Sequence, residues 1–279
     1  MSATLEALVL GIGFWSPQLP SWETARDVLR GTADAPAEPA PRVAPSLLAP
    51  TERRRAPDTV AIGIEVAARA CAMAGRDPRS LASVFASSHG DLPINDYMCA
   101  TLATAPRQLS PTRFHNSVHN AVSGYWTIGT GCMKPSTAIS AWDCSFGAGL
   151  LESLVQVATE REAVIFVAYD VASRGPLATV TASEGMLAAA LVLGPVDADS
   201  QIALARLCCR VSDGQPAAAV AALPRRWETL LPANAMRPCL PLFAALAGDS
   251  PARLTFGVGS GTVLDVAIEV ECPSKRSDA

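Results

Sequence analysis

The sequence is poor in the residues on which most catalytic and metal sites depend. It has 279 residues but only 3 histidines, and none of these follows residue 119. Lysine is limited to Lys134 and Lys275, so lysine chemistry is poorly supplied. No pair among its 8 cysteines has the C-x-x-C spacing, and Cys208 and Cys209 are adjacent. This pattern favours reduced thiols over zinc knuckles or disulfides.

Long apolar runs and an excess of positive charge are also absent. Stretches such as 186–194 are too short for a bilayer, which needs about 20 residues, and no basic segment precedes the first apolar run as in a secretory signal. Lysine and arginine total 22 against 26 acidic residues, a net charge of −4, so nothing favours nucleic acid or an anionic membrane as partner. With 49% apolar residues, we expect a globular, cytoplasmic protein with an ample core.

Strand-like and helix-like segments alternate along the first 195 residues. Strands are predicted at 5–15, 81–88, 136–141, 163–170 and 186–195. Helices are predicted at 21–30, capped by Ser21, and at 57–75, 94–104, 117–130 and around 144–158. The alternation predicts an α/β fold with a mixed sheet of about five strands, covered by helices.

The remaining segments have weaker patterns. Residues 201–211 are a candidate strand, 224–247 read as short helical pieces ending at Gly248, and 254–270 as a β-hairpin around Ser260-Gly261. Five prolines within 31–50 indicate a linker or surface loop, and the polar tail at 273–279 is expected to be disordered. We expect residues 1–279 to form a single domain.

Cys144 lies where an amphipathic helix is predicted to begin, with Asp143 or Ser145 as its N-cap. First-turn amides and the helix dipole favour a thiolate, as in a nucleophile that carries an acyl group. The neighbouring Asp143 opposes a thiolate, and the bulk of Trp142 is able to wall off the sulfur. The alternative interpretation is a small, inert residue that fills space at the helix start.

His115 and His119 are separated by one predicted helical turn, a spacing that suits zinc. A hydrolytic zinc helix has glutamate directly after the first histidine, and here that residue is Asn116. We therefore predict neither a metal nor a cofactor, and assign His115, Asn116, His119 and Asn120 to hydrogen bonding or ligand binding. Activation of Cys144 by His115 or His119 remains an open alternative.

A short basic run, Glu52-Arg53-Arg54-Arg55, precedes the helix predicted at 57–75. Such a run is typical of a solvated surface. A docking site for an acidic partner is the alternative hypothesis.

Four stretches resemble, in order, the N-terminal half of β-ketoacyl synthases. They are SPTRFHNSVHNAVSGYWTIGTG (110–131), AWDCSFGAGLLES (141–153), AVIFVAYD (163–170) and SEGMLAAALVLG (183–194). The F-H-N-S-V-H-N run and the G-L-L-E after the cysteine look closest to the half-size, chain-length-factor-like subunits of aryl polyene pigment clusters. The resemblance covers about residues 5–195 and implies one half of a thiolase-like fold.

The resemblance places Cys144 at the position of the ketosynthase nucleophile. It also implies that condensation needs two histidines, and usually a lysine, from a C-terminal half. Here no histidine follows residue 119, H-G-T-G-T and G-H motifs are missing, and the residues after 200 are too few for a second half. Alone, the chain is therefore not expected to condense acyl groups, and Cys144 is expected to be vestigial.

The resemblance further implies how the chain associates. Members of the family pair through the strand before the cysteine and a small-residue helix, which here means Thr137, Ile139 and Ala141 together with Ala121 and Gly124. The expected partner is a full-length ketosynthase in an acyl-carrier-dependent polyene or fatty-acid-like pathway, with an acyl carrier protein as a further partner and a homodimer as the other option. Two alternatives stay open: a stand-alone Cys–His acyltransferase or thioesterase using Cys144, and an α/β domain without an active site.

Overall fold

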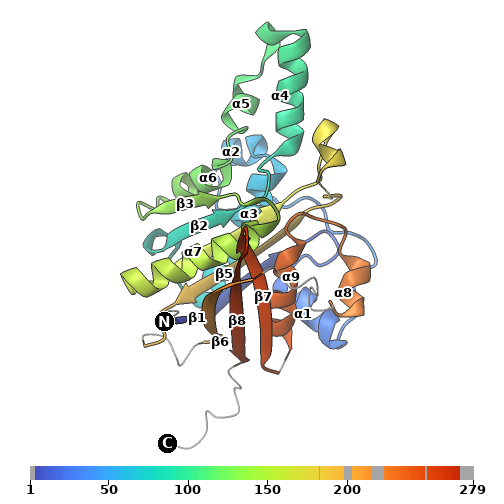
Figure 1. Ribbon diagram of the computed structural model, residues 1–279. Helices are drawn as coiled ribbons and strands as arrows, with labels where there is room; N and C mark the ends of the chain where they lie inside the picture. The colour runs from blue at the N-terminus through green and yellow to red at the C-terminus, as the bar shows by residue number, and fades with distance from the viewer. Residues whose placement is uncertain (1–3, 182, 198–202, 215–222, 249, 271–279) are drawn as a thin grey trace, which may run out of the picture.

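An eight-stranded mixed sheet forms the centre of the computed structural model, in the order β3-β2-β4-β5-β1-β6-β8-β7 (Figure 1). The structure describes residues 4–181, 183–197, 203–214, 223–248 and 250–270. The strands are β1 (Thr4–Trp15), β2 (Ala82–Ala86), β3 (Ser136–Ile139), β4 (Val164–Asp170), β5 (Leu187–Gly194), β6 (Ala205–Asp213), β7 (Ala252–Gly259) and β8 (Thr262–Val270). Only β3-β2 and β2-β4 pair in parallel, and every other pairing is antiparallel.

Helices cover both faces of this sheet and leave one part of it open. The helices are α1 (Trp22–Arg30), α2 (Pro50–Arg55), α3 (Asp58–Ala74), α4 (Leu92–Thr104), α5 (Pro111–His115), α6 (Ala121–Thr130), α7 (Ser145–Glu160), α8 (Arg225–Leu230) and α9 (Leu240–Ala247). One hydrophobic cluster joins the sheet to α3 and α6, and a second joins the opposite face to α7, α1, α8 and α9. No described helix has the length and apolar character needed to cross a membrane.

Two glycines of β1 let the helix α3 approach this strand closely. A Cβ at Gly11 would lie 2.2 Å from the carbonyl oxygen of Ala70, and one at Gly13 would lie 2.0 Å from that of Val66. No side chain larger than hydrogen fits there. The close contact between α3 and β1 thus depends on these two positions.

The predicted fold class agrees with this architecture, but the sheet has eight strands where about five were expected. The three additional strands, β6, β8 and β7, continue the same sheet beyond β1. Residues on β6 such as Arg206, Cys208 and Arg210 are partly or fully exposed, so no continuous apolar run marks this strand. Its weak sequence signal comes from having only one covered face. The hairpin predicted around Ser260-Gly261 is confirmed as β7–β8.

The helix predicted at 117–130 begins only at Ala121, and a separate short helix, α5, ends at His115. Asn116 is buried, donates to the Arg55 carbonyl oxygen and accepts a hydrogen bond from the Tyr125 hydroxyl. These tertiary hydrogen bonds compete with a continuous helix. His115 and His119 therefore do not lie one turn apart on a common helical face.

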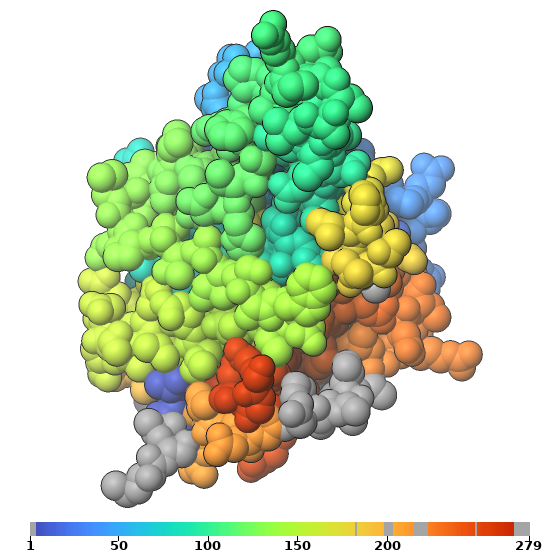
Figure 2. All heavy atoms as spheres, turned by 45° about the horizontal axis from the view of Figure 1, so that its top comes forward, coloured from blue at the N-terminus to red at the C-terminus, as the bar shows by residue number. Residues whose placement is uncertain are grey.

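The helices α4 and α5 project beyond the sheet (Figure 1), and their residues form the top of the molecule in the space-filling view (Figure 2). The segment at 175–179, yellow in that view, lies against the base of α4. Residues 31–49 form neither helix nor strand. The predicted tail at 273–279 lies outside the described residues.

Candidate functional site

Cys144 is itself the N-cap of α7, so neither Asp143 nor Ser145 has the predicted capping role. A short 3-10 turn, Trp142–Cys144, precedes the helix. The Ser145 hydroxyl accepts a hydrogen bond from the Ala141 amide at 2.9 Å and donates to the Trp142 carbonyl at 2.6 Å. Ser145 is thus occupied in closing this turn, which leaves it unable to cap the helix.

Trp142 has a backbone φ of +54°, a left-handed conformation that bulky residues rarely adopt. Its carbonyl also accepts a hydrogen bond from the Ser88 hydroxyl at 2.9 Å, and the His89 ring meets its indole edge-on with centroids 4.9 Å apart. Trp142 is 54% exposed, and Cys144 keeps partial access to solvent beside it. Strain of this kind persists only where surrounding contacts enforce it.

The thiol of Cys144 is half-buried, and its pKa is raised from the ordinary value. Burial is the main cause, and the adjacent Asp143 carboxylate adds to it through charge repulsion and a hydrogen bond. Among the described residues, no hydrogen bond joins Cys144 to a histidine. A protonated thiol without a base is a poor nucleophile.

A buried carboxylate organises the loop that faces this turn. Asp170, at the end of β4, accepts hydrogen bonds from the Ser87 hydroxyl at 2.7 Å and the Ser88 amide at 2.9 Å. Its removal from water raises its pKa to about 6, although the hydrogen bonds from Ser87 and Ser88 act in the opposite direction. Ser88 in turn contacts Trp142, so Asp170 and the turn before Cys144 belong to one hydrogen-bond network.

Of the residues predicted to bind, only His119 lies near this network. Its Nε2 lies 2.9 Å from the Ser87 carbonyl oxygen, and proximity to His119, after burial, lowers the pKa of His89. His115 is exposed beside the Tyr125 ring, and Asn120 is exposed just before α6. The described residues contain no group of three or more side chains able to hold a metal ion.

His89, Ser88 and Asp170 were not identified from the sequence as residues of a site. Their signal was available in principle. Polar residues at the carboxyl ends of neighbouring parallel strands meet at the same edge of a sheet, and β2 and β4 are such neighbours. The pairing of these two strands had not been predicted.

The residues predicted to form an interface lie at one edge of the molecule. The strand β3 is the last of the sheet, and it carries Thr137 and Ile139, both half-buried, with Ala141 just beyond its end. The helix α6, which bears Ala121 and Gly124, packs beside it (Figure 1).

One side of β3 has free backbone groups. The carbonyl oxygens of Pro135 and Ile139 accept hydrogen bonds from the amides of Ser83, in β2, and Ser87, just after it. Backbone groups alternate in direction along a strand, so those of Ser136 and Ala138 point to the open edge. Nearby, Ile128 is 78% exposed and Met133 is 95% exposed.

A hollow of about 390 Å³ lies along α6, between this helix and the segment that precedes α2. Its apolar lining includes Leu47, Val118, Ala121, Gly124 and Ile128. A Cβ added at Gly124 would meet nothing within 4 Å. Gly124 therefore faces open space that another chain is able to fill.

Comparison with models of protein families gives a match over most of the chain. Residues 22–230 match the family model of the β-ketoacyl synthase N-terminal domain. A search of the curated proteins finds no match.

Solved structures with a similar fold include ketosynthases and their complexes. One chain of the ketosynthase ApeO in complex with its chain length factor ApeC, from Xenorhabdus doucetiae, is 20% identical with a TM-score of 0.67, over 94% of this chain and 99% of that one. A chain of AntDE:AntF, an acyl-carrier protein with its ketosynthase, is 13% identical with a TM-score of 0.74, over 96% and 100%. The ishigamide ketosynthase/chain length factor is 14% identical with a TM-score of 0.71, over 96% and 100%. These likenesses confirm the thiolase-like, mixed α/β fold.

Proposed function

The chain belongs to the family of the β-ketoacyl synthase N-terminal domain, and we propose that it is an accessory, chain-length-factor-like subunit. In this proposal it pairs with a full-length ketosynthase in an acyl-carrier-dependent polyene or fatty-acid-like pathway of the cytoplasm. An acyl carrier protein is a further partner. A ketosynthase with its chain length factor is among the structures of similar fold, which supports this role.

The observation that carries the proposal is the open edge of the sheet at β3, flanked by the exposed apolar side of α6. Free N–H and C=O groups on Ser136 and Ala138 offer a template for another strand. Exposed apolar groups such as Ile128 and Met133 add area that favours association. We expect a joint interface of more than roughly 2,000 Å² in total, the size of a permanent complex.

The surroundings of Cys144 support an accessory role over a catalytic one. The pKa of its thiol is raised by burial and by Asp143, and no described histidine reaches it by a hydrogen bond. Nothing observed favours the Cys–His acyltransferase or thioesterase interpretation. In a reconstituted pathway, Cys144→Ser should therefore leave product formation unchanged, and loss of product with intact pairing would contradict the proposal.

The pairing itself is tested by a matched pair of variants at Ala138. Ala138→Pro removes one N–H at the open edge and leaves the β2–β3 hydrogen bonds intact, whereas Ala138→Val keeps the N–H at similar size. We expect wild type and Ala138→Val to co-elute with the ketosynthase encoded beside this chain, and Ala138→Pro to elute alone. Size-exclusion chromatography with light scattering gives the masses.

A wild-type chain that stays monomeric with every ketosynthase offered would refute the proposal. Ile139→Asp is a less clear test of the same strand. Ile139 is half-buried and packs against the hydrophobic cluster beneath α7, so a charge there would disturb the fold as well as the contact.

A further inference from the structure

The hollow of about 390 Å³ along α6 lies on one side of this helix, and β3 packs against a different side. Ala121, Gly124 and Ile128 line the hollow at three- and four-residue spacing, so they share one helical face. Ser123 is on the β3 side, where its hydroxyl oxygen lies 2.7 Å from that of Ser136. A chain that pairs with β3 must therefore cross α6 to reach the hollow.

The helix offers little obstruction to a chain that crosses it. A Cβ at Gly124 would meet no atom within 4 Å, so the backbone of a partner is able to lie close to α6 there. On the rim of the hollow, Ile128 is 78% exposed and Val118 is 51% exposed. A small molecule that filled only the hollow would leave these two side chains in water, whereas a protein surface covers them as well. The exposed apolar rim thus favours a protein as the occupant.

The walls of the hollow are held by contacts within the chain. Opposite α6 lies the segment that precedes α2, and a Cβ at Gly129 would lie only 2.8 Å from the Cδ2 atom of Leu47 on this segment. Arg53 donates to the carbonyl oxygens of Ser46 and Leu48, at 3.2 and 2.9 Å, and so holds the same segment to α2. This arginine of the basic run therefore has a structural role.

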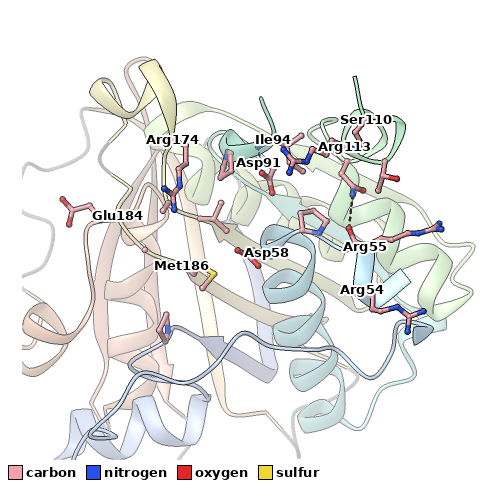
Figure 3. A pocket seen from close by; sticks show the side chains of 18 residues that line it. Arg54, Arg55, Asp58, Asp91, Ile94, Ser110, Arg113, Arg174, Glu184 and Met186 are labelled. Atoms are coloured by element: carbon pink, nitrogen blue, oxygen red, sulfur yellow. Dashed lines mark hydrogen bonds between the residues drawn. The ribbon is translucent and has the colours of Figure 1, made fainter. Parts of the chain in front are cut away.

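A second set of hydrogen bonds ties α2 to α5 and α6. Asn116 donates to the Arg55 carbonyl oxygen at 3.2 Å, the bond drawn dashed in Figure 3, and accepts from the Tyr125 hydroxyl at 3.1 Å. Tyr125 itself lines the hollow. Because its walls are already ordered, the hollow loses little conformational freedom when it is filled, which lowers the cost of binding.

The lining determines the chemistry of the group that enters. Its polar side chains, apart from Tyr125, are Glu52, His115 and Asn120, and the last two are exposed. An apolar interior with a polar, hydrated rim is the arrangement found around the anchor residues of protein interfaces. The other lining residues are all apolar: Leu47, Leu48, Ala49, Val118, Ala121, Gly124, Ile128 and Gly129.

We propose that a bulky apolar side chain of the partner ketosynthase anchors in this hollow, and that the partner's chain crosses α6 at Gly124 between the hollow and β3. The inference rests on the proposed function, since it needs the ketosynthase as partner. It adds a second contact, separate from strand addition at β3, that selects the partner surfaces able to fit.

Filling the hollow from α6 tests the anchor. Ala121→Leu places a larger side chain in the hollow and leaves the edge of β3 unchanged. The dissociation constant for the ketosynthase encoded beside this chain should rise roughly thirtyfold, the effect of losing one hot-spot contact. Ala72→Leu, at an exposed position of α3, adds the same bulk elsewhere and should pair as the wild type does. Biolayer interferometry gives the dissociation constants, and thermal melts show whether both variants are folded.

A thiol at the rim gives a second measurement that does not depend on affinity. Val118→Cys should be alkylated by iodoacetamide about tenfold more slowly in the saturated complex than in the isolated chain, because the partner covers the thiol. Ala72→Cys should react at the same rate in both. Peptide mapping by mass spectrometry assigns each rate to its cysteine.

The outcomes separate this inference from the proposed function. If Ala138→Pro abolishes pairing while Ala121→Leu pairs normally and Val118→Cys is not protected, the contact at β3 stands and the anchor is refuted. Equal losses of affinity in Ala121→Leu and Ala72→Leu would also refute it. If the wild type pairs with no ketosynthase offered, both proposals fail. Protection of Val118→Cys by decanol alone, as strong as that by the ketosynthase, would assign the hollow to a small apolar ligand instead.

Discussion

At the scale of single residues, the environment of Cys144 outweighs its position in the chain. A cysteine at a helix N-terminus normally gains thiolate character from the first-turn amides. Here burial and the Asp143 carboxylate act against those amides and raise the pKa of the thiol. The location alone suggests a nucleophile, but burial of the thiol and the neighbouring carboxylate together keep it protonated.

The reactivity of Cys144 should therefore respond to Asp143. In the wild type we expect slower alkylation by iodoacetamide at pH 8 for Cys144 than for Cys99, which is exposed on α4. Asp143→Asn should raise the Cys144 rate by roughly threefold, because it removes the repulsion between carboxylate and thiolate. Peptide mapping by mass spectrometry gives both rates in one sample, and Glu152→Gln, further along α7, is the matched control. A wild-type Cys144 as fast as Cys99 would contradict the prediction.

Asp170 gives a prediction about pH. Its pKa in the folded protein is raised to about 6, from an ordinary value of 3.8, so the folded state holds this proton more tightly than the unfolded chain. Ionisation of Asp170 consequently destabilises the fold progressively as the pH rises through that window, by about 2 to 3 kcal/mol in full. Asparagine does not titrate. The free energy of unfolding of Asp170→Asn should therefore increase by this amount relative to that of the wild type between pH 4 and pH 7.

Urea unfolding of both proteins at several pH values provides the measurement. The quantity to compare is the change with pH in the difference between the two free energies of unfolding. The loss of an acceptor for the Ser88 amide only adds a constant cost to the variant. A difference between the two proteins that stays the same from pH 4 to pH 7 would show that Asp170 is not perturbed in this way.

At the scale of elements, two helical glycines have opposite roles. A Cβ at Gly147 on α7 would lie 2.1 Å from the carbonyl oxygen of Gly257 on β7, so the helix and the hairpin are in backbone contact there. Gly124 on α6 has no atom within 4 Å of the same position. The first glycine supports packing within the chain, and the second lies on the surface we propose for the partner.

Replacement by alanine should separate these roles. We expect Gly147→Ala to destabilise the protein by about 3 kcal/mol, because neither backbone is able to move away cheaply. Gly124→Ala should stabilise the isolated chain by about 0.5 to 1 kcal/mol through higher helix propensity. It should also weaken pairing with a ketosynthase. Thermal unfolding and co-elution measure the two effects, and unchanged pairing in Gly124→Ala would remove α6 from the proposed interface.

The sequence was sufficient to predict the elements with a strong apolar periodicity. It was insufficient where contacts between distant residues determine the structure. The strands β1, β4 and β5 are buried on both faces and were predicted within a few residues. The break between α5 and α6 was missed, because it depends on hydrogen bonds of Asn116 to Arg55 and Tyr125, which are distant in the chain. Asp170 was missed for the same reason, because its role depends on the pairing of β4 with β2.

At the scale of the whole molecule, residues from both ends of the described chain share one hydrophobic core. The hydrophobic cluster beneath α7 includes residues of β1, α1, α9 and β8, so it joins both ends of the described chain. The Phe256 ring on β7 packs against Phe146 on α7 with centroids 5.2 Å apart. The C-terminal hairpin is therefore expected to fold together with the rest of the protein, as part of one domain.

Truncation of Phe256 tests this expectation. Phe256→Ala should lower the free energy of unfolding by about 3 kcal/mol, since it removes a buried ring and leaves a cavity beside Phe146. Because the cluster is continuous, the loss should appear in a single transition. Far-ultraviolet circular dichroism and tryptophan fluorescence, which reports on Trp15 and Trp227 in the core, should give the same midpoint. Thr255→Ala, on the more exposed side of β7, is the matched control with a smaller expected loss. Two separate transitions in Phe256→Ala, with the tryptophan signal at the wild-type midpoint, would mean that the hairpin is an independent unit.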